Sequence, residues 1–193
     1  MIIIYIQKYG GIIIPVPKKG NLNDVNNYLG ITLSSIFSRI FSMLIDTRLR
    51  KWANDNNVLH DNQFGFVKST VDCIFVLTPI LDKIVKHEKR KLYCSFVDLK
   101  KCFVYVYRNC IWFKLIEQGV SSKLVKTLQS MYSTVTSCVI VIGTLSEFLD
   151  SYMGVKQGEP LSPLLFISFV NDMSSYLQTD SLDYLSIDEL QIY

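Results

Sequence analysis

Apolar residues recur at helical spacing along much of the chain. The clearest stretch runs from about Ser35 to Asp55, where one face repeats every three to four residues. Ser34 or Ser35 can cap its start. We expect an amphipathic helix whose apolar face packs on the core, and the residues of that face are Phe37, Ile40, Phe41, Leu44, Ile45, Leu49 and Trp52.

The same spacing predicts further helices. One starts near Ser69, where Ser-x-x-Asp has the spacing of a capping box, and Pro79 inside it should bend it. The others are Tyr107–Gln118, which Gly119 ends, Ser122–Tyr132, and an apolar helix that opens at a Gly-Pro corner and runs through Val170.

Short β-branched or continuous apolar runs predict strands. Leu92–Leu99 has the composition of a strand buried on both faces, with Asp98 near its end. Leu182–Tyr193 is apolar on both sides of two acids and predicts a hairpin. The other predictions are a strand over Ile12–Val16, a polar loop over Asn21–Leu29, and a hairpin of Thr136–Ile142 and Glu147–Val155 around Gly143.

The composition indicates one folded domain. Of 193 residues, 49% are hydrophobic and 19% are charged, which argues against disorder, and the net charge of +3 is too small to imply nucleic acid. Five cysteines without a C-x-x-C pair and two histidines argue against a disulfide scaffold or a zinc site. Reduced thiols suit an intracellular compartment. No apolar run reaches the roughly 20 residues of a membrane span, and no signal peptide is evident.

Three carboxylates are candidates for chemistry. A charge at Asp98, at the end of an apolar strand, is costly unless it is paired or bound to metal. Asp188 and Glu189 lie together at the predicted turn, and two such acids beside Asp98 would form an oxygen-rich site suited to Mg²⁺. The alternative is a solvent-facing strand end and ordinary turn acids.

The segment Gly154–Pro163 is the most informative. Its glycines allow a ligand to approach the backbone closely. Gln157 supplies a donor and an acceptor, and Lys156 supplies a positive charge. The alternative is a glycine-rich turn that leads into a core helix.

Six blocks follow one another along the chain: Ile13–Gly20, Asn27–Leu33, Gln63–Phe66, Phe96–Asp98 through Phe103, Gly154–Phe166 with Asn171 and Asp172, and Leu185–Leu190. In this order they resemble the reverse transcriptase domain of non-LTR (LINE-type) retrotransposons, which has a Tyr-Ala-Asp-Asp turn at the place of the last block. They span about residue 11 to 193, so chance agreement is a poor explanation.

The resemblance implies a two-metal nucleotidyl transfer. Asp98 and Asp188 would bind two Mg²⁺ ions, replaceable by Mn²⁺, and Glu189 would complete the catalytic acids. The reaction would join a deoxynucleoside triphosphate (dNTP) to the 3′-hydroxyl of a DNA primer on an RNA template. No membrane, disulfide or zinc partner is expected.

The resemblance also assigns residues to the nucleotide. Phe103 would be an aromatic gate that rejects a 2′-hydroxyl, and Gln157 and Gly158 would line the incoming nucleotide. Lys18 or Lys19 would reach the triphosphate.

The implied fold is the right-hand polymerase type, an α+β fold whose mainly antiparallel palm sheet packs on helices. Fingers would take approximately residues 1–91 and 120–155, and palm approximately 92–119 and 156–193. The thumb is expected to lie beyond the last residue.

Several polar positions depart from the family pattern. Glu189 replaces an Asp, Leu29 replaces an Arg that would hold the triphosphate, and Val104 replaces an Asp. These changes leave a second hypothesis open. The chain would then be a truncated, partly degenerate copy, a catalytically inactive remnant with at most weak nucleic-acid binding.

Overall fold

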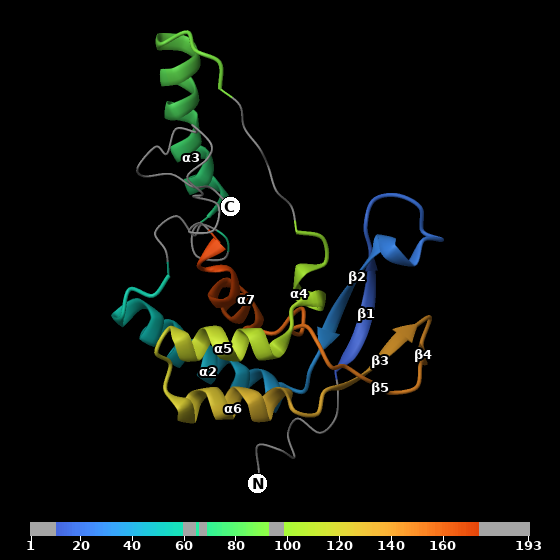
Figure 1. The fold of residues 1–193 in the computed structure, drawn as a ribbon. Helices are drawn as coiled ribbons and strands as arrows, with labels where there is room; N and C mark the ends of the chain where they lie inside the picture. Colours follow the sequence, from blue (N-terminus) through green and yellow to red (C-terminus); the bar gives the residue numbers. More distant parts are fainter. Residues whose placement is uncertain (1–10, 60–64, 66–68, 93–98, 174–193) are drawn as a thin grey trace.

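The chain folds into a group of packed helices with a small β-sheet at one end (Figure 1). The computed structural model describes residues 11–59, 65, 69–92 and 99–173. The predicted acids Asp98, Asp188 and Glu189 lie outside these residues, as do the strand around Asp98 and the hairpin at Leu182–Tyr193. The described part is mixed α/β.

The sheet joins two distant parts of the sequence. Strand β1 (Ile12–Pro17) pairs antiparallel with β2 (Tyr28–Leu33) and parallel with β3 (Thr136–Val141). The strand order is β2-β1-β3-β4, where β4 is Thr144–Leu145, and β5 (Leu149–Asp150) also pairs with β3, so the sheet is mixed. The strand predicted at Ile12–Val16 is confirmed.

The loop predicted over Asn21–Leu29 is wrong at its end. A 3-10 turn, η1 (Val25–Asn27), leads directly into β2 at Tyr28. The polar Asn-rich composition hid this start, because Tyr28 and Leu29 become extended by pairing with Pro17 and Val16 of β1.

The predicted hairpin at Gly143 is confirmed, although its return strand is shorter than expected. Strands β4 (Thr144–Leu145) and β5 (Leu149–Asp150) each pair with β3 over two residues. Ser146 interrupts the return, and its hydroxyl accepts a hydrogen bond from the Val139 N–H at 2.9 Å. The side-chain bond replaces regular pairing and divides the strand.

The predicted helices form with their predicted caps. Ser35 caps α2 (Ile36–Asp55), and Ser69 and Asp72 form the capping box of α3 (Thr70–Leu81). Pro79 does not end α3, which continues as a π-helical segment, η2 (Asp82–His87). The remaining helices are α4 (Cys102–Tyr105), which was not predicted, α5 (Arg108–Glu117), α6 (Ser122–Tyr132) and α7 (Ser162–Val170).

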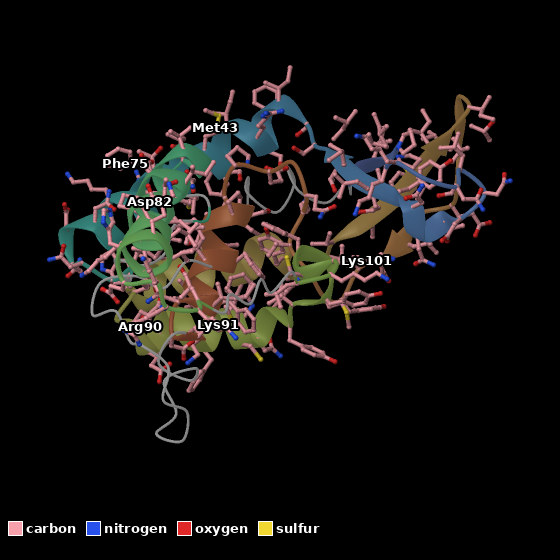
Figure 2. The ribbon with its side chains drawn as sticks, turned by 90° about the horizontal axis from the view of Figure 1, so that it is seen from above. Met43, Phe75, Asp82, Arg90, Lys91 and Lys101 are labelled. Atoms are coloured by element: carbon pink, nitrogen blue, oxygen red, sulfur yellow. The ribbon has the colours of Figure 1, made fainter. Side chains whose placement is uncertain are left out.

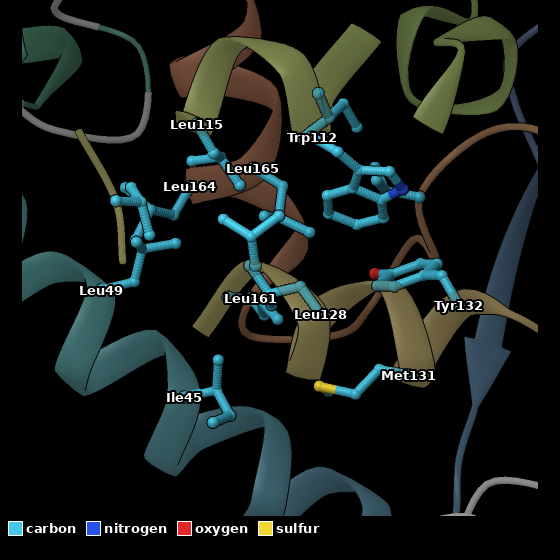
Figure 3. Packing of buried hydrophobic residues seen from close by; sticks show 14 of the residues in the cluster. Ile45, Leu49, Trp112, Leu115, Leu128, Met131, Tyr132, Leu161, Leu164 and Leu165 are labelled. Carbon is cyan, nitrogen blue, oxygen red and sulfur yellow. The ribbon is translucent and has the colours of Figure 1, made fainter. Parts of the chain in front are cut away.

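Four helices, α2, α5, α6 and α7, build the hydrophobic core (Figure 3). Burial of one large apolar side chain contributes about 1.5–3 kcal/mol. Trp112 and Tyr132 meet at a ring-centroid distance of 5.7 Å and close the end of the core toward the sheet. The largest fully buried side chains include Leu49, Ile111, Leu115, Leu128, Leu161, Leu164, Leu165 and Ile167.

The predicted apolar face of α2 is only partly correct. Ile45 and Leu49 are buried, but Phe37 is 72% exposed and Leu44 is 56% exposed. The buried stripe begins instead with Ser38 and Ser42. The first half of α2 is apolar around most of its circumference, so periodicity alone could not identify the face that packs. The face with the small serines lies inward, and Ser42 borders a small cavity together with Met131 and Tyr132 of α6.

Candidate functional site

The Gly154–Pro163 corner lies against strand β2. The backbone N–H of Thr32 donates to the carbonyl of Gln157 at 2.8 Å. Gly158 has φ +102°, and a Cβ there would lie 3.1 Å from the carbonyl oxygen of Thr32. A side chain at position 158 would therefore meet a left-handed backbone and a tight contact with Thr32, and glycine avoids both.

The other end of the corner lies against α4. The N–H of Gly154 donates to the carbonyl of Val106 at 2.8 Å, and that of Val155 donates to the carbonyl of Phe103 at 2.7 Å. Gly154 has φ +78°, and a Cβ there would lie 2.5 Å from the carbonyl oxygen of Val104. Two requirements, a left-handed backbone and a close contact, fix glycine at this position.

Phe103 is joined to the corner by its ring as well as its backbone. Its ring stacks on Phe166 of α7 at a centroid distance of 4.9 Å. The side chain is partly buried and packs on the core. Three of the predicted nucleotide-contacting residues, Phe103, Gln157 and Gly158, therefore belong to one connected unit.

Lys18 and Lys19 lie exposed beyond the end of β1, at the tip of the β1–β2 hairpin. Ile13 pairs with Thr32, the residue that binds Gln157, and Lys18 follows five residues later. At about 3.4 Å per residue, Lys18 lies about 17 Å along the chain from this contact, and Lys19 follows it.

Lys101 connects the hairpin tip to α4. Its ammonium group donates to the side-chain oxygen of Asn26 at 2.8 Å. Figure 2 shows Lys101 between the helices and the sheet. Because Phe103 follows two residues later, the hairpin, α4 and the corner are connected on one side of the molecule.

Arg108 holds the segment that enters the corner. Its guanidinium donates five hydrogen bonds, of which the shortest, 2.6 Å, goes to the carbonyl of Ser151. Another, at 2.8 Å, goes to the carbonyl of Gly154. Burial lowers the pKa of Arg108 from its ordinary value. Sequence reasoning missed this residue, although one signal was present: a cation in the first turn of a helix opposes the helix dipole.

A second buried polar group lies within the corner. Glu159 is 6% exposed, and among the described residues neither of its carboxylate oxygens has a hydrogen-bond partner. It borders a cavity of about 10 Å³ together with Ser42, Tyr132 and Lys156. Burial lowers the pKa of Lys156, and the charge of Glu159 opposes that change.

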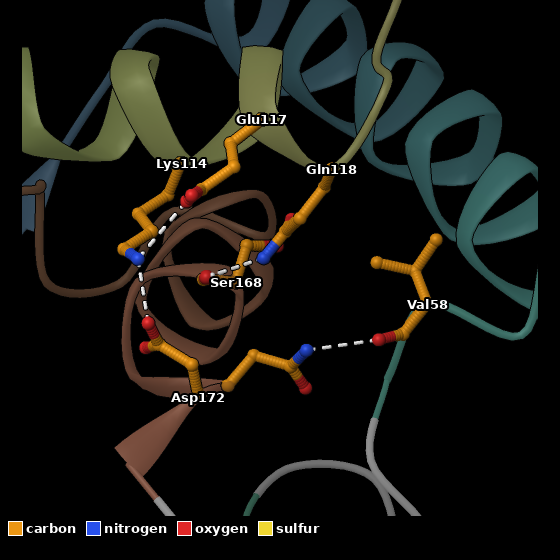
Figure 4. A network of polar contacts seen from close by, with 7 residues as sticks. Val58, Lys114, Glu117, Gln118, Ser168 and Asp172 are labelled. Carbon is orange, nitrogen blue, oxygen red and sulfur yellow. Dashed lines mark hydrogen bonds and ion pairs between the residues drawn. The ribbon is translucent and has the colours of Figure 1, made fainter. Parts of the chain in front are cut away.

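Polar contacts fix the end of α7 to α5 and to the end of α2 (Figure 4). The ammonium group of Lys114 donates to Asp172 at 2.5 Å, which raises the pKa of Lys114. The side-chain amide of Asn171 donates to the carbonyl of Val58 at 2.8 Å. The last residues of the Gly154–Asp172 block therefore stabilise the fold.

Cys73, Cys110 and Cys138 are free thiols, and Cys94 lies outside the described residues. Within the described ranges, no cluster of three histidine, cysteine or acidic side chains has a metal-binding arrangement. No helix in those ranges is long and apolar enough to cross a bilayer.

Of the six blocks quoted above, β2 and the corner carry two, and α4 carries Phe103 at the end of a third. The profile of the family described as "Reverse transcriptase (RNA-dependent DNA polymerase)" matches residues 16–193. The chain belongs to the reverse transcriptase family. The predicted resemblance is therefore confirmed over most of the chain.

Curated relatives agree with this reverse transcriptase assignment. The chain is 28% identical over 171 residues to "Retrovirus-related Pol polyprotein from type-1 retrotransposable element R2" of Popillia japonica, covering 85% of this chain and 23% of the relative. It is 29% identical over 168 residues to "Probable RNA-directed DNA polymerase from transposon BS" of Drosophila melanogaster, covering 76% of this chain and 16% of the relative. The chain thus corresponds to a reverse transcriptase domain of non-LTR retrotransposons and spans less than a quarter of the length of these relatives.

Proposed function

We propose that this reverse transcriptase domain extends a DNA primer on an RNA template. The observation that carries the proposal is the corner at Gln157 and Gly158, which is held between β2 and α4 inside a chain that belongs to the family. Because β2 and α4 hold the backbone of the corner from two sides, the side-chain amide of Gln157 starts from a fixed position. Positioning and charge stabilisation are the main contributions to phosphoryl-type transfer.

The described residues would position the nucleotide through direct contacts. Gln157 is half-buried and offers both a donor and an acceptor, while Gly158 removes any side chain from the surface beside it. The ring of Phe103, fixed by Phe166, would contact the sugar. Lys18 and Lys19, being exposed, would attract the phosphates of the triphosphate or the template.

The reaction would be an in-line displacement. The oxygen of the primer 3′-hydroxyl attacks the α-phosphorus of the dNTP, the hydroxyl proton is lost, and pyrophosphate leaves. Asp98, Asp188 and Glu189 would supply the carboxylates of this site, and carboxylate oxygens are the ligands that Mg²⁺ prefers. Reverse transcriptases as a family use divalent ions, and two Mg²⁺ (or Mn²⁺) would neutralise the charge of the attacking and leaving oxygens.

The corresponding architecture is the fingers and palm of a right-hand polymerase. We assign approximately residues 1–91 and 120–155 to fingers and 92–119 and 156–193 to palm. Asp98 and Asp188 would lie on adjacent antiparallel strands of the palm. Support for this architecture comes from the family assignment and from the mixed α/β structure of the described part.

Primer extension with Mg²⁺, dNTPs and a primed RNA tests the proposal. Wild-type protein should incorporate dNTPs, and Asp98→Ala should abolish incorporation. Asp82→Asn is the matched control, because Asp82 is a partly exposed acid of η2 that pairs only with Lys86 at 2.8 Å among the described contacts. Equal loss in both variants, or activity retained in Asp98→Ala, would contradict the proposal.

Glu189→Asp tests the inactive-remnant hypothesis. A misplacement of about 1 Å can cost about 100-fold in rate, so restoring the shorter acid should accelerate incorporation by about 10- to 100-fold if Glu189 limits catalysis. Wild-type protein that binds template RNA but incorporates nothing, with Mg²⁺ or with Mn²⁺, would favour the remnant. Such binding should weaken steeply with added salt.

A further inference from the structure

Arg108 makes contacts that the packing of α5 alone does not require. It is the first residue of α5, yet its guanidinium turns toward the segment 151–154. Nε donates to the carbonyl of Gly154 at 2.8 Å. One terminal nitrogen donates to the carbonyls of Ser151 and Tyr132 at 2.6 and 3.3 Å, and the other donates to the Ser151 hydroxyl and the Met153 carbonyl, both at 3.0 Å.

We propose that Arg108 is a positioning residue of the polymerase site, which fixes the backbone of residues 151–154 so that Gln157 is presented in one orientation. The inference rests on the proposed function of the corner. Arg108 itself is assigned no contact with the nucleotide. It acts through the carbonyls that it binds on the segment immediately before Lys156 and Gln157.

Two sets of hydrogen bonds, from Arg108 and from the Thr32 N–H, hold the segment 151–157, and we call them the clamp. Arg108 holds the entry of the corner, and the N–H of Thr32 holds the carbonyl of Gln157 at 2.8 Å. Between them, the N–H groups of Gly154 and Val155 bind α4 and the residue that follows it. Without the guanidinium, the carbonyls of Ser151, Met153 and Gly154 would lose a charged donor, and the segment could rotate.

The geometry requires the planar fork of arginine. Five donors in fixed directions reach several carbonyls at once, whereas a lysine ammonium has three donors at one point. The guanidinium also lies 5.3 Å from the centre of the Tyr132 ring, so the clamp rests on the core. A lysine at this position would keep the charge and lose most of the bonds.

Amide hydrogen exchange tests the clamp without any need for activity. In Arg108→Lys, the amides of Gly154 and Val155 should exchange at least about tenfold faster, the change expected for loss of one or two hydrogen bonds to a charged group. Arg50→Lys is the matched control, since Arg50 also loses a hydrogen bond to an oxygen, that of Asp46 one turn earlier in α2. Unchanged exchange at Gly154 and Val155, or an equal increase throughout α6 and α7, would overturn the proposal.

Steady-state primer extension tests the positioning role. Arg108→Lys should raise KM for the dNTP by about 10- to 100-fold because Gln157 is displaced, with a smaller change in kcat. A fall in kcat with KM unchanged would overturn the role at the nucleotide. Wild-type protein that extends no primer would contradict the proposed function, and the exchange comparison would then decide on the clamp alone.

Chemical rescue separates the clamp from simple packing. Arg108 borders an open cavity of about 360 Å³ that also contacts Trp112, Tyr132 and Ser151, so a small guanidinium compound has access. Low millimolar guanidinium should restore part of the slow exchange at Gly154 in Arg108→Ala, and equal sodium chloride should not. Equal effects of the two salts would overturn the requirement for the fork.

Discussion

The helical layer and the β-sheet of this domain bury their side chains very differently. The core residues of α5, α6 and α7 are nearly inaccessible, whereas the sheet exposes Val141, Leu145 and Leu149 by half or more. Among the sheet residues that the structure describes, only Cys138 is fully buried. The helices therefore provide the stable base. The sheet forms an extension that carries Lys18 and Lys19. The corner connects the sheet to the helices.

The core should respond most strongly to truncation. Leu165→Ala removes a fully buried side chain of α7 and should cost about 2–5 kcal/mol of unfolding free energy in urea denaturation. Leu149→Ala in β5 is the control, since Leu149 is 65% exposed and should cost less than about 1 kcal/mol. Similar costs at both positions would contradict the contrast between the regions.

Two glycines allow the cost of a left-handed backbone to be measured separately from the cost of a close contact. Gly143 and Gly154 share φ +78°, but a Cβ at position 143 meets nothing within 4 Å. Gly143→Ala, in the hairpin, should cost about 1–2 kcal/mol for the left-handed conformation alone. Gly154→Ala should cost about 1–3 kcal/mol more, because its Cβ would overlap Val104. Denaturation midpoints measure the difference, and equal losses would contradict the close approach.

Tyr132 adds a pH dependence to the helical base. Burial raises its pKa to about 12, above the ordinary 10.0. The hydroxyl therefore stays protonated to a higher pH in the folded state than in the unfolded state. Its contribution to the free energy of unfolding is complete below pH 10 and is lost as the pH rises from 10 to 12. This loss should reach about 2–3 kcal/mol.

The comparison that isolates this group is wild type against Tyr132→Phe. Urea denaturation from pH 8 to 11 should show that the variant loses less stability at alkaline pH than the wild type does. Parallel curves would show that Tyr132 ionises normally.

The smallest effect is expected at the start of α3. Ser69→Ala removes one half of the capping box with Asp72 and should cost about 1 kcal/mol. The main contacts of α3 are with η2, its own continuation. The effect of the substitution should therefore stay within this helix. Exchange of the first amides of α3 measures it, and an equal change in α5 would contradict this local character.

Local signals in the sequence predicted the helices well. Ser35, Ser69 and Gly119 each mark a boundary through a hydrogen bond or a backbone conformation that depends on neighbours in the chain. The segment 28–33 was harder, because a strand in a polar context forms only when its partner is present. The short helix α4 was missed for the same reason, since tertiary contacts to Gly154 and Val155 hold it.

The candidate site divides in the same way. Gln157 and Gly158 were found from composition and from the family pattern, and the structure describes how β2 and α4 hold them. Arg108 was not found, because an isolated arginine in a helix carries no motif. The roles of Asp98, Asp188 and Glu189 remain predictions that primer extension tests.

The sequence by itself determined the longer helices, their caps, the glycines of the corner and the family to which the chain belongs, because these depend on local spacing and residue type. Only the tertiary structure decided which face of α2 is buried, that β1 pairs with β3 across more than 100 residues, and that Arg108 binds the corner. Those features depend on which surfaces meet, and a helix with apolar residues on several faces leaves that choice to its neighbours.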